Sequence, residues 1–163
     1  MTIQELGESL IERRQTITSA ESLTAGLFAA SLAEVSGISA VFPGAFVTYA
    51  AEAKTELVGV PKQLIETYGV VSKQVALAMA FGALRRLKTD WAVSFTGVAG
   101  PDSLEGQPAG TVYIGIAHGI EGSYAQKFSF SGDRQAVRKQ SVEAAAELLG
   151  AILKTPEKYF EQN

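Results

Sequence analysis

Short, apolar, β-branched segments alternate with helical patterns along this chain, and that alternation constrains its fold more than any other feature. We predict strands over 16–20, 45–49, 91–96, 111–117 and 123–130, and helices over 3–13, 27–35, 51–58, 61–68, 72–87 and 133–153. The last two strands surround a short turn and are typical of a hairpin. Strands separated by helices, followed by a hairpin and a helix, predict an α/β fold: three α/β/α layers around a mixed, mostly parallel sheet of about five strands.

The length of 163 residues predicts a single domain, because a chain of this size can bury a core of its own. Apolar residues make up 47% of the chain and charged residues 19%, a balance typical of globular proteins. The polar segment 156–163 is expected to be a frayed tail. We therefore treat residues 1–163 as one domain that ends in such a tail.

The rarest residue types exclude several chemistries. Cysteine is absent, which excludes disulfides, thiolate metal sites and a cysteine nucleophile. The one histidine, His118, lies near the hairpin turn, where we expect it to be solvated. A serine–histidine–aspartate hydrolase would have to use it, and a site with several histidine ligands is impossible. We expect neither a metal site nor a cofactor.

The net charge of −3 gives the chain no general attraction to nucleic acid or to anionic membranes. No apolar run approaches the roughly 20 residues that span a bilayer. The first residues lack the basic flank and apolar stretch of a signal peptide. We therefore expect a cytoplasmic protein whose partner is a small molecule rather than nucleic acid or a membrane.

Ser22 is the first candidate for chemistry. Ligands of open α/β sheets bind at the carboxyl ends of strands, and Ser22 lies where the first predicted strand turns into a helix. Its hydroxyl could act as a nucleophile, with the backbone N–H groups of Leu23, Thr24 and Ala25 open to an anion. The common alternative is that Ser22 or Thr24 simply caps the helix.

Tyr49 ends the second predicted strand, and Lys54 lies in the predicted helix that follows it. A lysine becomes a general base when burial or a neighbouring charge lowers its pKa, and a tyrosine can donate or relay a proton. The alternative is a solvated lysine and a tyrosine at the sheet edge. Because the chain has no cysteine and one histidine, lysine is the most plausible activator of a nucleophilic serine.

Two further segments could bind a ligand. The loop 97–102 carries Gly97 and Gly100, which would let its backbone approach a ligand closely, although an ordinary loop is equally consistent. Arg134 and Arg138 are four residues apart at the start of the last predicted helix and could clamp a phosphate. Most such pairs are surface charges.

Taken together, these segments resemble, in order, the motifs of the CinA C-terminal domain family. The resemblance covers about 3–153 and is carried by Glu21-Ser22-Leu23-Thr24-Ala25-Gly26, 44–54, Gly69-Val70-Val71-Ser72, 96–102, 108–112 and Phe130-Ser131-Gly132-Asp133-Arg134. The family includes stand-alone nicotinamide mononucleotide deamidases, which belong to the pyridine nucleotide cycle. The resemblance implies a three-layer fold, a homodimer and an amidohydrolase that converts nicotinamide mononucleotide to nicotinate mononucleotide and ammonia.

The resemblance also implies roles for individual residues. It assigns catalysis to Ser22, Tyr49 and Lys54, with Lys54 acting on the serine directly or through Tyr49. The substrate-binding residues that we predict are Thr24, Ala25, Gly26, Gly97, Gly100 and Arg134.

The first motif departs from the family pattern Glu-Ser-Cys-Thr-Gly-Gly, because this chain has Leu23 and Ala25 at its third and fifth positions. The Cβ of Ala25 could narrow the pocket or conflict with a backbone conformation that favours glycine. Two alternatives follow: a nucleotide-binding or interaction module with little or no catalysis, and an amidase for a related pyridine or nucleoside amide.

Overall fold

The computed structural model describes residues 1–160, and its centre is a five-stranded sheet with the order β2-β1-β3-β4-β5. The strands are β1 (Ile17–Glu21), β2 (Phe46–Val47), β3 (Trp91–Gly97), β4 (Thr111–His118) and β5 (Gly122–Ser129). β1 pairs in parallel with both β2 and β3, whereas β4 is antiparallel to β3 and to β5. Every strand except β4 therefore points the same way, which confirms the mixed, mostly parallel α/β sheet predicted from the sequence.

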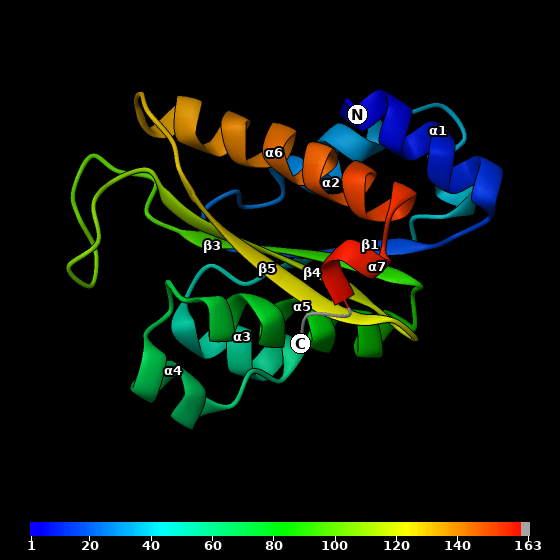
Figure 1. Cartoon of the computed structure of the whole chain (residues 1–163). Coiled ribbons are helices and arrows are strands. Elements are labelled where there is room, and N and C mark those ends of the chain that lie inside the picture. Colours follow the sequence, from blue (N-terminus) through cyan, green and yellow to red (C-terminus); the bar gives the residue numbers. More distant parts are fainter. Residues whose placement is uncertain (161–163) are drawn as a thin grey trace.

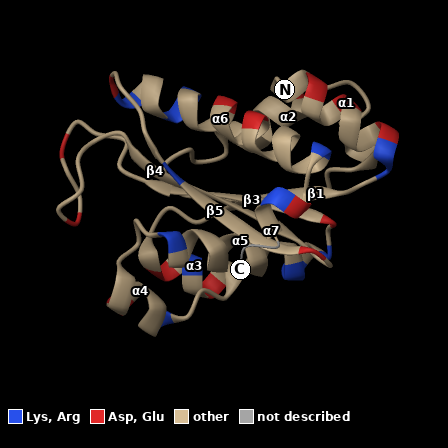
Figure 2. Ribbon diagram, in the orientation of Figure 1, with Lys and Arg blue, Asp and Glu red and all other residues tan. Residues whose placement is uncertain are grey.

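Helices cover both faces of this sheet, which makes the three predicted layers (Figure 1). One layer holds α1 (Ile3–Arg13), α2 (Leu27–Ala33) and the long α6 (Arg134–Lys154). The other holds α3 (Ala51–Val58), α4 (Lys62–Tyr68) and α5 (Lys73–Leu87). A short 3₁₀ helix, Ile38–Ala40, follows α2 and contacts α1 and α2. Charged residues belong mainly to the helices and loops, and the strands contain few of them (Figure 2).

The two faces of the sheet bury side chains of different size. Large residues of the central strands, such as Phe95, Ile114 and Ile116, pack toward α1, α2 and α6. Small residues face α5, which therefore lies close to the sheet: a Cβ at Gly115 would come within 2.6 Å of the Ala76 carbonyl oxygen. The sheet is consequently held tightly on the α5 side and filled by bulky side chains on the other.

Helix boundaries agree with the caps expected from the sequence. The Ser72 hydroxyl accepts a hydrogen bond from the Val75 N–H (3.2 Å) and begins α5, and the Asp133 carboxylate accepts one from the Ala136 N–H (2.9 Å) and begins α6. The second strand is shorter than predicted, since only Phe46 and Val47 pair with β1. It lies at the sheet edge, where it has a single neighbour.

The chain after Pro156 differs from the expected frayed tail. It forms α7 (Glu157–Phe160), and the buried Phe160 ring stacks on Trp91 with centroids 6.3 Å apart. The expectation failed because the segment is polar on average, whereas one aromatic ring is enough to anchor it. Residues 161–163 of the predicted tail lie outside the described residues.

His118 also differs from the solvated histidine that we expected. Its ring lies against Trp91, with centroids 4.3 Å apart, and its Nδ1 accepts hydrogen bonds from the N–H groups of Ile120 and Glu121. The histidine therefore closes the β4–β5 hairpin, at the end of β4 opposite to the turn that follows β1.

Candidate functional site

The turn that follows β1 presents Ser22 at the edge of the sheet where β1, β2 and β3 all end. The Ser22 N–H donates to the Phe95 carbonyl (3.0 Å), which fixes the turn to β3, and the Ala25 N–H donates to the Ser22 carbonyl (3.0 Å). Ala25 and Gly26 both have positive φ, 47° and 96°. The Ala25 position thus has the conformation that favours glycine.

Glu21, rather than Ser22 or Thr24, caps the helix after this turn. Its fully buried carboxylate accepts hydrogen bonds from the N–H groups of Phe28 (2.9 Å) and Ala29 (3.0 Å) at the start of α2. The capping alternative considered for Ser22 and Thr24 is therefore wrong, and the Ser22 hydroxyl is available for another partner. No sequence signal identified Glu21, because it lies outside the helix that it caps.

Lys54 is the partner of Ser22. Its side chain runs from α3 into the interior, where Nζ donates to the Ser22 hydroxyl (3.0 Å) and to the carbonyls of Thr48 (2.8 Å) and Tyr49 (3.3 Å). The residue is only 1% exposed. Burial lowers the pKa of Lys54 from the ordinary 10.5 to about 8, against the opposing effect of the carboxylates of Glu105 and Glu52.

Glu105 belongs to the long loop after β3 and was not identified from the sequence. Its carboxylate accepts hydrogen bonds from the N–H groups of Val70 (3.0 Å) and Val71 (2.9 Å), which ties that loop to the segment before α5. Because its negative charge favours the ammonium form of Lys54, this loop also affects the charge state of the lysine.

Tyr49 contributes two groups that face different partners. Its backbone carbonyl accepts hydrogen bonds from Lys54 Nζ and from the Ser22 hydroxyl (3.3 Å each). Its side chain is 55% exposed, and the hydroxyl accepts a hydrogen bond from Arg134 Nη2 (2.7 Å). The phenol therefore lies beside the arginine, and not between Ser22 and Lys54.

The two arginines of α6 both reach the site but have different partners. Arg134 Nη1 donates to the Gly100 carbonyl (2.7 Å), so its guanidinium joins the loops that follow β2 and β3. Arg138 instead donates to the carbonyls of Leu23 (Nε, 2.9 Å) and Thr24 (Nη2, 3.0 Å). The predicted pair is therefore divided: Arg134 faces the loops, and Arg138 fastens the Ser22 turn.

A pocket of about 300 Å³ opens next to these residues, at the lower end of the size range of small-molecule sites. Of the residues predicted to bind substrate, Gly97, Gly100 and Arg134 line it. The full lining consists of Leu23, Tyr49, Gly97, Val98, Ala99, Gly100, Pro101, Asp102, Leu104 and Arg134. The pocket therefore lies between Arg134 and the residues bonded or adjacent to Ser22.

The other three predicted binding residues, Thr24, Ala25 and Gly26, lie in the turn and are not part of that lining. Thr24 is fully buried, and its hydroxyl has no hydrogen-bond partner within the part of the chain that the structure describes. A larger hollow of about 660 Å³ lies among α1, α2 and α6. Ser22 and Lys54 line neither hollow, but the smaller one is lined by Leu23, which follows Ser22, and by Tyr49, whose carbonyl accepts a hydrogen bond from Ser22. The smaller pocket is thus the better candidate for a site.

Residues 1–160 contain neither a candidate membrane span nor a candidate metal-binding cluster. No helix in this range is both long and apolar enough to cross a membrane. Over the same range, no three histidine, aspartate or glutamate side chains gather closely enough to hold a metal ion.

Comparison with known proteins places this architecture in a family. The CinA C-terminal domain model matches residues 2–153. A competence-damage inducible protein of Lactiplantibacillus plantarum is 54% identical over 140 residues, which are 86% of this chain and 33% of that protein. One from Streptococcus agalactiae is 53% identical over 147 residues, which are 90% of this chain and 35% of that protein. The chain thus spans about a third of the length of these curated relatives.

Solved structures show the same fold. A CinA superfamily protein from Escherichia coli superposes with a TM-score of 0.86 at 34% identity and covers 91% of this chain and 88% of its own. A competence/damage inducible protein from Agrobacterium tumefaciens superposes with a TM-score of 0.85 at 36% identity and covers 92% and 94%. With the family match over nearly the whole chain, these similarities show that the chain belongs to the CinA C-terminal domain family.

Proposed function

We propose that this chain is an amidohydrolase that converts nicotinamide mononucleotide to nicotinate mononucleotide and ammonia, with Ser22 as nucleophile. The observation that carries the proposal is the contact of 3.0 Å between Lys54 Nζ and Ser22 Oγ, made by a lysine that is almost completely buried. A surface lysine would be a poor base at neutral pH. A buried lysine with a lowered pKa beside a serine is a recognised means of activating the hydroxyl.

In the proposed reaction, neutral Lys54 removes the proton from Ser22 Oγ while that oxygen forms a bond to the carboxamide carbon. The carbonyl oxygen becomes an oxyanion, which N–H groups of the turn after β1 stabilise. The lysine then returns the proton to the amide nitrogen, the C–N bond breaks and ammonia leaves. Water attacks the resulting ester with Lys54 again as base, which releases the carboxylate and restores the Ser22 hydroxyl.

The direct contact favours Lys54 acting on Ser22 without a tyrosine relay, since the Tyr49 hydroxyl is bonded to Arg134. We assign Tyr49 and Arg134 to substrate binding at the pocket, together with Gly97 and Gly100. A guanidinium suits the phosphate of a mononucleotide, because it can offer two parallel N–H donors.

The test is an ammonia-release assay with nicotinamide mononucleotide and free nicotinamide side by side. We expect turnover of the nucleotide, loss of turnover in Ser22→Ala, and a fall of about 10²-fold or more in Lys54→Met. Lys62→Met is the matched control, because it removes an exposed lysine from α4. Full ammonia release by Ser22→Ala would refute the serine mechanism.

A nucleotide-binding module without catalysis is the second candidate, favoured by the positive φ of Ala25 in the turn that carries Ser22. It predicts a rise in melting temperature with the nucleotide but no ammonia. Turnover with a better substrate among related pyridine or nucleoside amides would instead redirect the substrate assignment. The proposal also includes a cytoplasmic location and a homodimer. Light scattering on the purified protein measures the oligomeric state.

A further inference from the structure

One helix, α6, fastens the three loops that surround the pocket. Arg134 bonds to the loops after β2 and β3 through Tyr49 and Gly100. One helical turn later, Arg138 bonds to the turn after β1 through the carbonyls of Leu23 and Thr24. The residues that form the site come from distant parts of the sequence, so this helix sets their relative positions.

The carbonyls that Arg138 holds belong to a chain of hydrogen-bonded peptide groups. The Leu23 carbonyl shares its peptide with the Thr24 N–H. The Thr24 carbonyl shares its peptide with the Ala25 N–H, which donates to the Ser22 carbonyl (3.0 Å). That last carbonyl shares its peptide with the Leu23 N–H. A positive charge at one end of such a chain polarises each N–H further along it.

The two N–H groups at the ends of this chain are open. Within residues 1–160, the N–H groups of Leu23 and Thr24 donate to no protein acceptor. The Ala25 N–H, which we expected to be available, is already used by Ser22. At the start of α2, Glu21 accepts from the N–H groups of Phe28 and Ala29, and the Leu27 N–H donates to the Thr24 carbonyl (2.9 Å). The open donors therefore belong to the turn itself and directly follow the candidate nucleophile.

We propose that Arg138 is a positioning residue that builds the oxyanion hole, by holding the Leu23 and Thr24 carbonyls so that the N–H groups of Leu23 and Thr24 face the reacting carbonyl oxygen. This inference rests on the proposed function. Arg138 does not touch the substrate; it acts through the turn. Arg138 also helps to hold the strained backbone of Ala25, which has a positive φ. The Thr24 carbonyl that accepts from Arg138 belongs to the residue directly before Ala25.

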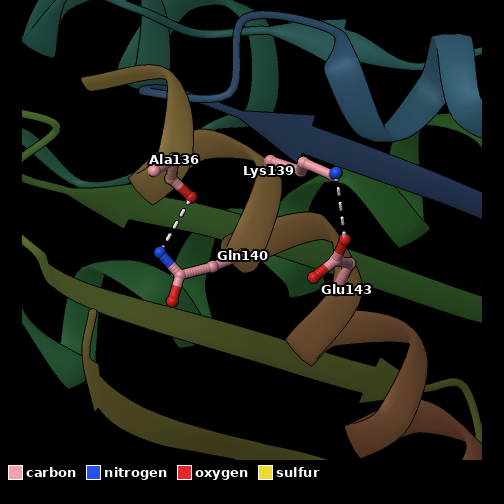
Figure 3. A network of polar contacts seen from close by, with 4 residues as sticks. All are labelled: Ala136, Lys139, Gln140 and Glu143. Atoms are coloured by element: carbon pink, nitrogen blue, oxygen red, sulfur yellow. Dashed lines mark hydrogen bonds and ion pairs between the residues drawn. The ribbon is translucent and has the colours of Figure 1, made fainter. Parts of the chain in front are cut away.

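The test compares steady-state kinetics of ammonia release for Arg138→Met, Arg138→Lys and Lys139→Met. Methionine removes both hydrogen bonds to the turn, whereas the ammonium group of lysine can keep one of them. Lys139 is the matched control, because it is the next cation on α6 and its side chain, 78% exposed, faces Glu143 (4.0 Å, Figure 3). Removing one oxyanion-hole donor lowers kcat by about 10²–10³-fold. Arg138→Met displaces the donors without removing them, so we expect kcat to fall by about 10–100-fold.

We expect the loss in Arg138→Met to fall on kcat, with KM changed less than about threefold, because the ground-state substrate does not carry the oxyanion charge. Arg138→Lys should lie between wild type and Arg138→Met, and Lys139→Met should equal wild type. A thioamide analogue of the substrate adds a second measurement, since sulfur accepts hydrogen bonds weakly. The ratio of oxygen to sulfur rates should fall in Arg138→Met and stay constant in Lys139→Met.

Three results would overturn the inference. A raised KM with unchanged kcat would make Arg138 a substrate clamp, and unchanged kinetics would leave it no role in the reaction. An equal loss in Lys139→Met would reduce the effect to the net charge of α6. If Arg138→Met does not fold by circular dichroism, the same split of kcat and KM is read from Arg138→Lys. Ser22→Ala runs beside these variants: turnover without Ser22 refutes the proposed function, whereas its loss together with wild-type kcat in Arg138→Met refutes this inference alone.

Discussion

Lys54 Nζ lies 3.0 Å from Ser22 Oγ, although the two residues are 32 positions apart in the sequence. The contact forms because β1 and β2 run in parallel, so that the turn after one strand and the helix after the other meet at the same edge of the sheet. Lys54 donates its three hydrogen bonds to Ser22 and to the Thr48 and Tyr49 carbonyls. This geometry makes the charge of one lysine the variable on which the proposed chemistry depends.

The activity should therefore depend on pH through Lys54. Its pKa of about 8 means that the neutral, basic form increases as pH rises through that value. We expect kcat for ammonia release to rise between about pH 7 and pH 9 and to level off above. Initial rates across this range, with saturating nucleotide, measure the midpoint. A rate that is constant across pH 8 would contradict Lys54 as the base.

Folding stability should depend on pH through the same residue. Because the pKa of Lys54 is lower in the folded chain (about 8) than in the unfolded chain (10.5), the unfolded chain binds more protons between these values. Stability contributed by this residue must therefore rise with pH across that window and be lowest below pH 8. The difference of about 2.5 in pKa corresponds to roughly 3 kcal/mol. Urea unfolding of wild type and Lys54→Met from pH 7 to 10 isolates the contribution of Lys54 to the free energy of unfolding. If that free energy changed with pH in the same way in both proteins, the lowered pKa would be contradicted.

Tyr49→Phe should separate binding from proton transfer. The variant removes only the hydroxyl that accepts from Arg134 and keeps the backbone carbonyl that contacts Lys54 and Ser22. We expect KM for the nucleotide to rise severalfold while kcat changes by less than about tenfold. Steady-state kinetics decide the point. A fall in kcat of the size typical for a lost acid or base, about 10²–10⁴-fold, would establish the tyrosine relay instead.

Ala25→Gly should stabilise the protein. Ala25 has a φ of 47°, where a Cβ is unfavourable, and glycine removes that strain at the cost of more freedom in the unfolded chain. The expected net gain is about 0.5–1 kcal/mol, measured by urea unfolding. Ala144→Gly within α6 is the opposite control and should destabilise by about 1 kcal/mol, because that position is helical. Equal signs for both variants would contradict the strain at Ala25.

Glu21→Gln tests the buried cap of α2. An amide keeps one acceptor oxygen, so one of the hydrogen bonds from Phe28 or Ala29 is lost and an N–H₂ is buried instead. We expect a loss of about 1–3 kcal/mol in the free energy of unfolding. Glu34→Gln, which changes an exposed carboxylate after the same helix, should stay within about 0.5 kcal/mol of wild type. A similar value for both would show that Glu21 contributes nothing as a cap.

Phe160→Ala tests whether α7 belongs to the fold. The ring is buried against Trp91, and its removal should cost about 2–4 kcal/mol by lost burial and packing. Ile120→Ala, at a side chain 92% exposed, should change the free energy of unfolding by less than about 0.5 kcal/mol. Thermal and urea unfolding of both variants give the comparison. A Phe160→Ala variant as stable as wild type would return the segment to the frayed tail that its composition suggests.

The sequence by itself determined the local structure and the candidates for chemistry. Side-chain periodicity identified the strands and helices, and Ser72 and Asp133 marked the starts of α5 and α6, because periodicity and caps are properties of neighbouring residues. The order of these elements also predicted the three-layer α/β fold. The position of Ser22 after the first strand made it a candidate nucleophile, and the absence of cysteine with a single histidine made Lys54 the candidate base.

Tertiary structure alone decided which of those candidates meet. It placed Lys54 against Ser22, turned the Tyr49 hydroxyl toward Arg134, gave the capping role to Glu21 and assigned Arg138 to the Ser22 turn. These contacts join segments that are remote in sequence, and a local sequence pattern does not indicate which donor will bond to which acceptor. The lowered pKa of Lys54 has the same origin, because it arises from burial by the rest of the chain.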